Sequence, residues 1–90
     1  MPKFLVEHTF GKEFFEMPQA GRDKNLKAAK AALTTDAYWV RSYMVPELRK
    51  VYCEWDAKDA ESIKQVWTKM GGATFDKLGE AKIIFSEDYR

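Results

Sequence analysis

The side chains best suited to chemistry in this sequence are His8, its single histidine, and Cys53, its single cysteine. An imidazole can ligate a metal or accept a proton, and a thiolate ligates soft metals. Glu7 adjoins His8, but successive side chains of a regular strand point to opposite faces, so the two would share a site only at a bulge or bend. The alternative is structural: a partly buried imidazole, and an inert thiol facing the helices beside Val51.

A second group of candidate residues comes from two adjacent apolar runs, residues 37–45 and 48–56. The short turn between them predicts an antiparallel hairpin. If Val45 pairs with Leu48, alternation divides the side chains between two faces. The face that mixes rings with charges holds Trp39, Arg41, Tyr43, Tyr52 and Glu54, and the more apolar face holds Val40, Ser42, Val51, Cys53 and Trp55. The mixed face could orient a small polar ligand, or its residues could simply pack and pair across the strands.

Common catalytic motifs are missing from the sequence. It contains no HExxH, no CxxC, no Ser-His-Asp order and no phosphate-binding glycine loop. The Gly71-Gly72 pair follows a predicted helix rather than a strand, which makes it a weak phosphate signal. The residues alone therefore name no reaction.

The elements that must position these side chains follow from periodicity. Residues 3–10 and 80–85 are rich in aromatic and branched residues and predict strands. Residues 23–33 and 60–70 show apolar residues at helical spacing and predict helices. The expected helix boundaries are Asp23 (or a start near Pro18), Asp59 and Gly71.

The resulting order, β-α-β-β-α-β, predicts one α+β domain over residues 1–90 with a ferredoxin-like arrangement. In that arrangement two helices cover one face of a four-stranded antiparallel sheet. The other face must be polar or covered by something else. Its mixture of rings and charges is typical of an interface, so we expect a homodimer of the dimeric α+β barrel type with a polar pocket at this face. The alternative is a solvated face on which β propensity alone explains the rings.

Length and composition narrow the function classes. Ninety residues allow one small core, yet 14% of the chain is aromatic, which is a heavy load for a core of this size. A net charge of +1 argues against nucleic acid as a partner. No apolar run approaches about 18 residues, so we expect no membrane partner. A single cysteine and the lack of a signal-peptide pattern favour a cytoplasmic protein.

Three stretches, MPKFLVEHTF, WVRSYMVPELRKVYCEWDA and DAESIKQVWTKMG, give the chain a family resemblance over nearly its whole length. It resembles a family of small bacterial ferredoxin-like proteins of unknown function, one of which binds nickel. The resemblance implies a homodimer and, as a cofactor, a transition metal such as nickel or zinc, with no organic cofactor. The metal-ligating residues it implies are His8, with Glu7, Cys53 and Tyr52 as helpers. Relatives often carry histidine where this chain has Arg41, Val66, Trp67 and Met70.

Two functions from different classes are therefore expected. The first is a small cytoplasmic homodimer that binds a ligand, which the resemblance implies to be a transition metal. The second, by analogy of fold, is a cofactor-independent oxygenase or isomerase, with Arg41 pairing the carboxylate of a small organic substrate. A dimerising module without catalysis is a third possibility.

Overall fold

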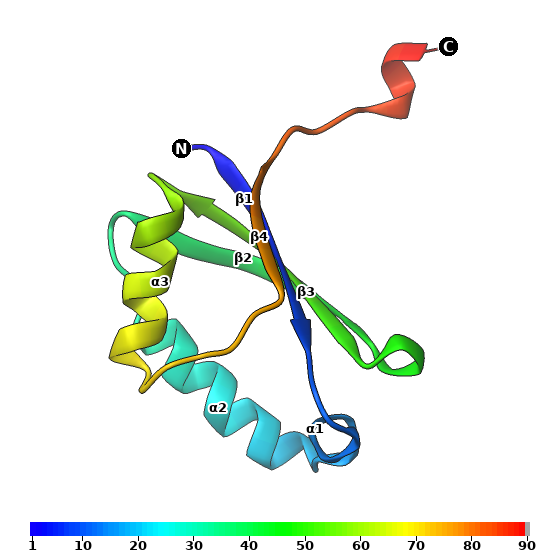
Figure 1. Cartoon of the computed structure of the whole chain (residues 1–90), viewed down its shortest axis with the longest axis vertical. Coiled ribbons are helices and arrows are strands. Elements are labelled where there is room, and N and C mark those ends of the chain that lie inside the picture. Colours follow the sequence, from blue (N-terminus) through cyan, green and yellow to red (C-terminus); the bar gives the residue numbers. More distant parts are fainter. Residues whose placement is uncertain (90) are drawn as a thin grey trace.

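The computed structural model of the chain describes residues 1–89 and contains a sheet flanked by helices (Figure 1). Residues 1–89 form three α-helices and four strands, with short 3₁₀ turns at Pro46–Leu48 and Ser86–Tyr89. The elements in order are β1 (Lys3–Thr9), α1 (Lys12–Glu16), α2 (Gln19–Ala31), β2 (Ala37–Val45), β3 (Lys50–Ala57), α3 (Ala60–Lys69) and β4 (Lys77–Ala81).

The sheet is antiparallel throughout, with the order β2-β3-β1-β4. Helices α2 and α3 lie on the same side of it (Figure 1), which leaves the opposite face open. This is the ferredoxin-like arrangement that the sequence predicts, and that prediction is confirmed. No helix within residues 1–89 is long and apolar enough to cross a membrane.

Helix α3 anchors the core. Its residues Ile63, Val66 and Trp67 are buried against Phe4 and Trp55 of the sheet. Apolar residues at spacings of three and four lie on one side of a helix, which is why this segment buries a single stripe. Phe4, Trp55 and Trp67 therefore form part of the core between the sheet and α3.

Both ends of α3 are capped as the sequence predicts. The Asp59 carboxylate accepts hydrogen bonds from the Ser62 backbone N–H (2.8 Å) and from the Ser62 hydroxyl (2.7 Å). At the other end Gly71 adopts a left-handed conformation (φ +94°), which residues with a side chain rarely accept. The helix therefore has a defined start and stop.

The cap at Asp59 makes stability depend on pH. Hydrogen bonds from Ser62 lower the pKa of Asp59 below its ordinary value of 3.8. A carboxyl whose pKa is lower in the folded state stabilises the fold above its unfolded pKa, and that contribution is lost as pH falls through the folded pKa. We predict that Asp59→Asn, which still caps, unfolds with a weaker pH dependence below pH 4 than wild type. Urea titrations at pH 2.5 and 7 measure this, and equal pH dependence would contradict it.

The first connection is more structured than predicted. Helix α2 begins directly after Pro18, which confirms the alternative start near Pro18 rather than the cap at Asp23, and a short additional helix, α1, precedes it. Proline suits a helix start because its φ is fixed and it has no N–H to leave unpaired. Asp23 therefore lies inside α2.

The β2-β3 hairpin differs in register from the prediction. Its turn spans residues 46–49, with Arg49 left-handed (φ +53°), so Val45 pairs with Lys50 rather than with Leu48. A shift of two residues preserves the faces, because side chains alternate with a period of two. A bulge at Val40, between Trp39 and Arg41, does change one face. It places Trp39 opposite Trp55 on the helix side, so the prediction for Trp39 is wrong.

The last strand also differs from the prediction. Strand β4 ends at Ala81 because Ala81 pairs with Lys3, the first residue of β1, and the sheet offers no partner beyond it. The predicted strand residues Ile83, Ile84 and Phe85 instead lie in an extended tail that leaves the body of the protein (Figure 1). Phe85 is 59% exposed and does not reach the core.

Candidate ligand-binding site

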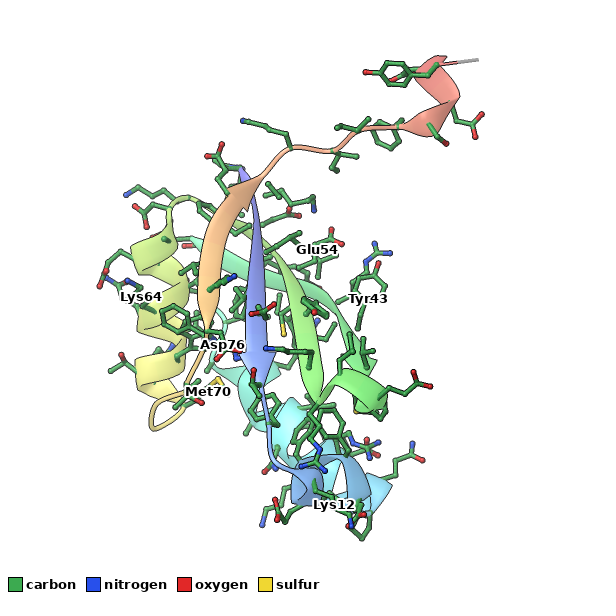
Figure 2. All side chains as sticks on the ribbon, turned by 45° about the vertical axis from the view of Figure 1, so that its right-hand side comes forward. Lys12, Tyr43, Glu54, Lys64, Met70 and Asp76 are labelled. Carbon is green, nitrogen blue, oxygen red and sulfur yellow. The ribbon has the colours of Figure 1, made fainter. Side chains whose placement is uncertain are left out.

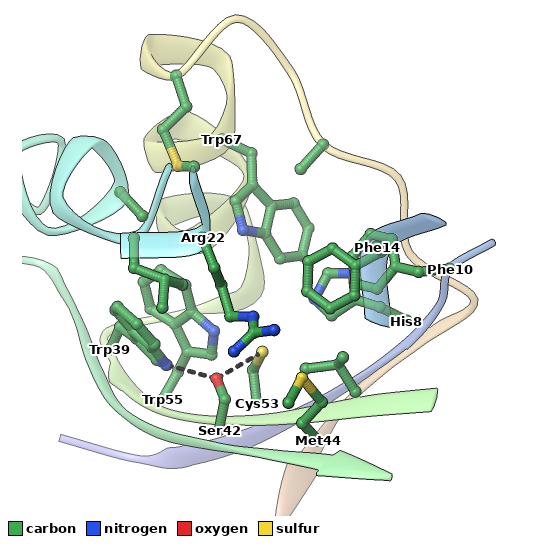
Figure 3. A pocket seen from close by; sticks show the side chains of 15 residues that line it. His8, Phe10, Phe14, Arg22, Trp39, Ser42, Met44, Cys53, Trp55 and Trp67 are labelled. Atoms are coloured by element: carbon green, nitrogen blue, oxygen red, sulfur yellow. Dashed lines mark hydrogen bonds between the residues drawn. The ribbon is translucent and has the colours of Figure 1, made fainter. Parts of the chain in front are cut away.

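A cavity of about 360 Å³ lies between α2 and the helix-facing side of the sheet (Figure 3). Its walls are largely aromatic and aliphatic, and they include Phe10, Phe14, Trp39, Trp55 and Trp67. Four polar side chains also line it: His8, Arg22, Ser42 and Cys53. An apolar cavity with a few polar groups is the usual composition of a small-molecule site.

The cavity exists because α2 stands away from the sheet. None of the residues of α2 is buried, and its cavity-facing stripe consists of Arg22, Leu26 and Ala29, spaced at i, i+4 and i+7. Ala29, the residue at the end of that stripe, is too small to fill the space. Stacked rings close another side, with Phe10 lying 5.5 Å from His8 and 4.3 Å from Phe14 between ring centroids.

Several of the polar groups are already satisfied by one another. The Trp39 indole N–H donates to the Ser42 hydroxyl (2.8 Å), which donates to the Cys53 sulfur (3.0 Å; Figure 3). His8 is 6% exposed, and its Nδ1 lies 2.6 Å from the carbonyl oxygen of Thr74. A carbonyl only accepts, so Nδ1 carries a proton, and the hydrogen bond to Thr74 leaves Nε2 without a part in it.

Cys53 is protonated at neutral pH. Burial raises the pKa of its thiol, and the hydrogen bond from Ser42 only partly opposes this. The thiolate is the form that attacks and ligates, so a thiol held neutral is a poor nucleophile and a poor ligand. The inert, helix-facing thiol is the alternative that the geometry supports.

Two donors at the cavity have no partner. The Arg22 guanidinium uses Nη2 to bond the Met17 carbonyl oxygen (3.0 Å), but its Nε is buried and unpaired. The indole Nε1 of Trp55, a residue that is 5% exposed, is likewise buried and unpaired. Within residues 1–89 no carboxylate forms an ion pair with Arg22. Buried donors are normally bonded, so these two need a partner that residues 1–89 do not supply.

The predicted metal-ligating residues are only partly brought together. His8 and Cys53 line the same cavity, whereas Glu7 lies on the opposite face, where it forms an ion pair with Lys50 (3.6 Å). The strand is regular there, so Glu7 does not turn toward His8. Across residues 1–89 there is no group of three or more His, Cys, Asp or Glu side chains placed to hold a metal ion.

The open face keeps four of the five residues predicted for its pocket: Arg41, Tyr43, Tyr52 and Glu54. Tyr43 pairs with Tyr52, and Tyr43 and Glu54 point away from α3 (Figure 2). The charges of this face are compensated, because Glu54 binds both Arg41 (3.4 Å) and Lys3 (2.5 Å), and Asp56 also binds Lys3 (2.8 Å). Arg41 is therefore already paired, which weakens it as an anchor for an anionic ligand.

Sequence reasoning missed Arg22 as a site residue. Its signal was present, since Arg22 stands four residues before Leu26 and seven before Ala29 on one helical stripe. With the helix capped at Asp23, Arg22 lies one residue outside it, and the predicted stripe of Leu26, Ala29 and Leu33 was not extended back to Arg22. A helix started at Pro18 places this cation on the face that looks at the sheet.

Residues 4–80 match the family described as nickel responsive protein SCO4226-like, and this chain belongs to that family. A search of curated proteins gave no match. Among solved structures, the chain is similar to the crystal structure of SCO4226 from Streptomyces coelicolor A3(2), with 15% identity and a TM-score of 0.60. That similarity covers 92% of this chain and 99% of the other. At this identity the neighbour supports the fold.

Proposed function

We propose that this protein binds a small, largely apolar organic molecule in the cavity between α2 and the sheet. The observation that carries the proposal is the cavity itself, about 360 Å³ in volume and walled by aromatic rings. Apolar side chains that line an unfilled cavity lack packing partners on one side, and a bound ligand supplies those contacts. The buried core lies mainly between the sheet and α3, and it meets the cavity at Trp55 and Trp67.

Titration with N-phenyl-1-naphthylamine, a neutral probe whose fluorescence rises in apolar surroundings, tests this function. The proposal predicts saturable binding of one probe per chain. Quenching of the tryptophan emission should accompany it, because Trp39, Trp55 and Trp67 all line the cavity. Fluorescence that rises linearly without saturating would contradict the proposal.

Nickel binding is the function that the family description suggests, and the donors within one copy of this chain do not fit it. The candidates are one imidazole, whose Nε2 alone is free to ligate, and one thiol whose pKa is raised, beside the cation of Arg22, and the described residues hold no group of three or more donors. Metal ligands must be deprotonated, and a neighbouring cation opposes a second one. We therefore do not propose His8, Glu7 or Cys53 as ligands of a nickel ion.

We further propose that a second copy of the chain covers the open face. Leu5 and Tyr43 are 49% and 54% exposed there, an apolar area that a soluble protein usually covers. Because Glu54 and its two cations pair with each other, covering the face would strand no charge. The protonated, unpaired Cys53 supports a cytoplasmic location for this dimer.

Light scattering of the untagged protein tests the dimer. We predict a mass twice the 10.5 kDa of one chain. Tyr43→Asp should shift the protein toward monomer by burying an unpaired charge, whereas Leu48→Asp, in the turn after β2, should not. A wild-type mass near that of one chain at micromolar concentration would contradict the dimer.

A further inference from the structure

The polar groups that line the cavity divide into satisfied and unsatisfied ones. Ser42 and Cys53 are linked to Trp39, and His8 is held by Thr74. The two unsatisfied groups are both hydrogen-bond donors, the Nε–H of Arg22 and the Nε1–H of Trp55. In Figure 3 the Arg22 guanidinium projects into the cavity toward Cys53, on the side where the Trp55 indole lies.

Charge at the cavity has one sign. Arg22 contributes a permanent positive charge, and neither aspartate nor glutamate lines the cavity. A cation in apolar surroundings without a counter-ion is costly, and an anion supplied by a ligand relieves that cost. The Nε–H of Arg22 and the Nε1–H of Trp55 both require an acceptor. Since one of these donors belongs to a cation, the missing partner is an anionic oxygen rather than a donor group.

The walls set the rest of the ligand. Rings surround the donors on several sides, and Trp67 stands edge-on to both His8 and Trp55, at 5.8 and 6.3 Å between ring centroids. Flat aromatic groups pack well in such surroundings. A single arginine neutralises one negative charge of a ligand, and a second negative charge would be buried without a partner.

From these observations we propose that the ligand is a monoanionic aromatic acid, whose acid oxygen accepts hydrogen bonds from Arg22 and Trp55 while its ring fills the cavity. This inference rests on the proposed function and names the chemical class of its ligand. It moves the anion anchor from Arg41, on the open face, to Arg22, on the helix side.

A matched pair of probes tests the inference. 8-Anilino-1-naphthalenesulfonate and N-phenyl-1-naphthylamine share one ring system and differ by a sulfonate. We expect the anionic probe to bind wild type about tenfold or more tighter than the neutral probe, as a charged hydrogen bond in a dry site allows. Arg22→Met should abolish this preference while the affinity for the neutral probe stays within about twofold.

Arg41→Met is the matched control, because it removes an equal charge from the open face and should leave the preference unchanged. Arg22→Gln repeats the test if the methionine variant fails to fold by circular dichroism. Binding of the neutral probe without a preference for the anion, or loss of the preference in Arg41→Met, overturns the inference and leaves the cavity function standing. A water molecule that satisfies both donors would give the first of these results. Binding of neither probe overturns the cavity function as well.

Discussion

Replacing Ala29 by Trp is expected to abolish binding of N-phenyl-1-naphthylamine. Ala29 is the small residue at the end of the cavity-facing stripe of α2, and an indole placed there occupies space that the probe needs. Alanine and tryptophan are both tolerated in a helix, so the backbone of α2 should keep its conformation. Fluorescence titration should then show no saturable component, and tryptophan quenching by the probe should disappear.

The control for this variant is Ala28→Trp. Ala28 is the preceding residue of α2, is exposed and does not line the cavity. It therefore adds the same side chain to the same helix without filling the site. Wild-type affinity in Ala29→Trp would place the bound probe elsewhere, and loss of binding in both variants would indicate a general effect on α2.

The second large effect concerns the support of the site rather than its lining. Ile63→Ala removes a side chain of α3 that has no exposed surface and packs with Val66 and Trp67. Truncating a buried isoleucine to alanine costs about 2–5 kcal/mol, through lost transfer free energy and the cavity left behind. Urea denaturation followed by far-UV circular dichroism should show this loss in the free energy of unfolding.

Gln65→Ala is the matched control on the same helix. Gln65 is exposed, so its truncation should change the free energy of unfolding by less than about 0.5 kcal/mol. Equal stability of the two variants would mean that α3 does not anchor the core as described.

The fold could be predicted from the sequence because its strongest signals are local. Alternation in the strands, the Asp59 cap and the Gly71 stop each depend on residues that are neighbours in the chain. The parts that failed depend on long-range pairing. The end of β4 is set by where β1 begins, and the bulge that turns Trp39 inward becomes visible only when β2 is aligned with β3.

The helix-side cavity could not be predicted from the sequence for the same reason, and it lies on the other side of the sheet from the pocket that the sequence predicts. The mixed face of the hairpin looked like a pocket because Arg41 appeared as a free cation among rings. Its pairing with Glu54, which Lys3 also binds from β1, comes from the sheet register. Arg22 lies outside a helix that starts at Asp23, and the alternative start near Pro18 was not followed to the face that Arg22 would occupy. Alternation alone placed Cys53 on the helix-facing side, where the cavity lies, and placed His8 on the face opposite Glu7.

The most direct test of the cavity as the binding site is a ¹H–¹⁵N titration that follows the three indole N–H signals. Trp39, Trp55 and Trp67 all line the cavity, and the Trp55→Phe variant identifies the Trp55 signal by its loss. With 8-anilino-1-naphthalenesulfonate we predict that the Trp55 signal moves most, downfield, because its unpaired Nε1–H gains an acceptor, while Trp39 stays bonded to Ser42. Unmoved indole signals, with shifts confined to the amides of Arg41, Tyr43 and Tyr52, would contradict the account.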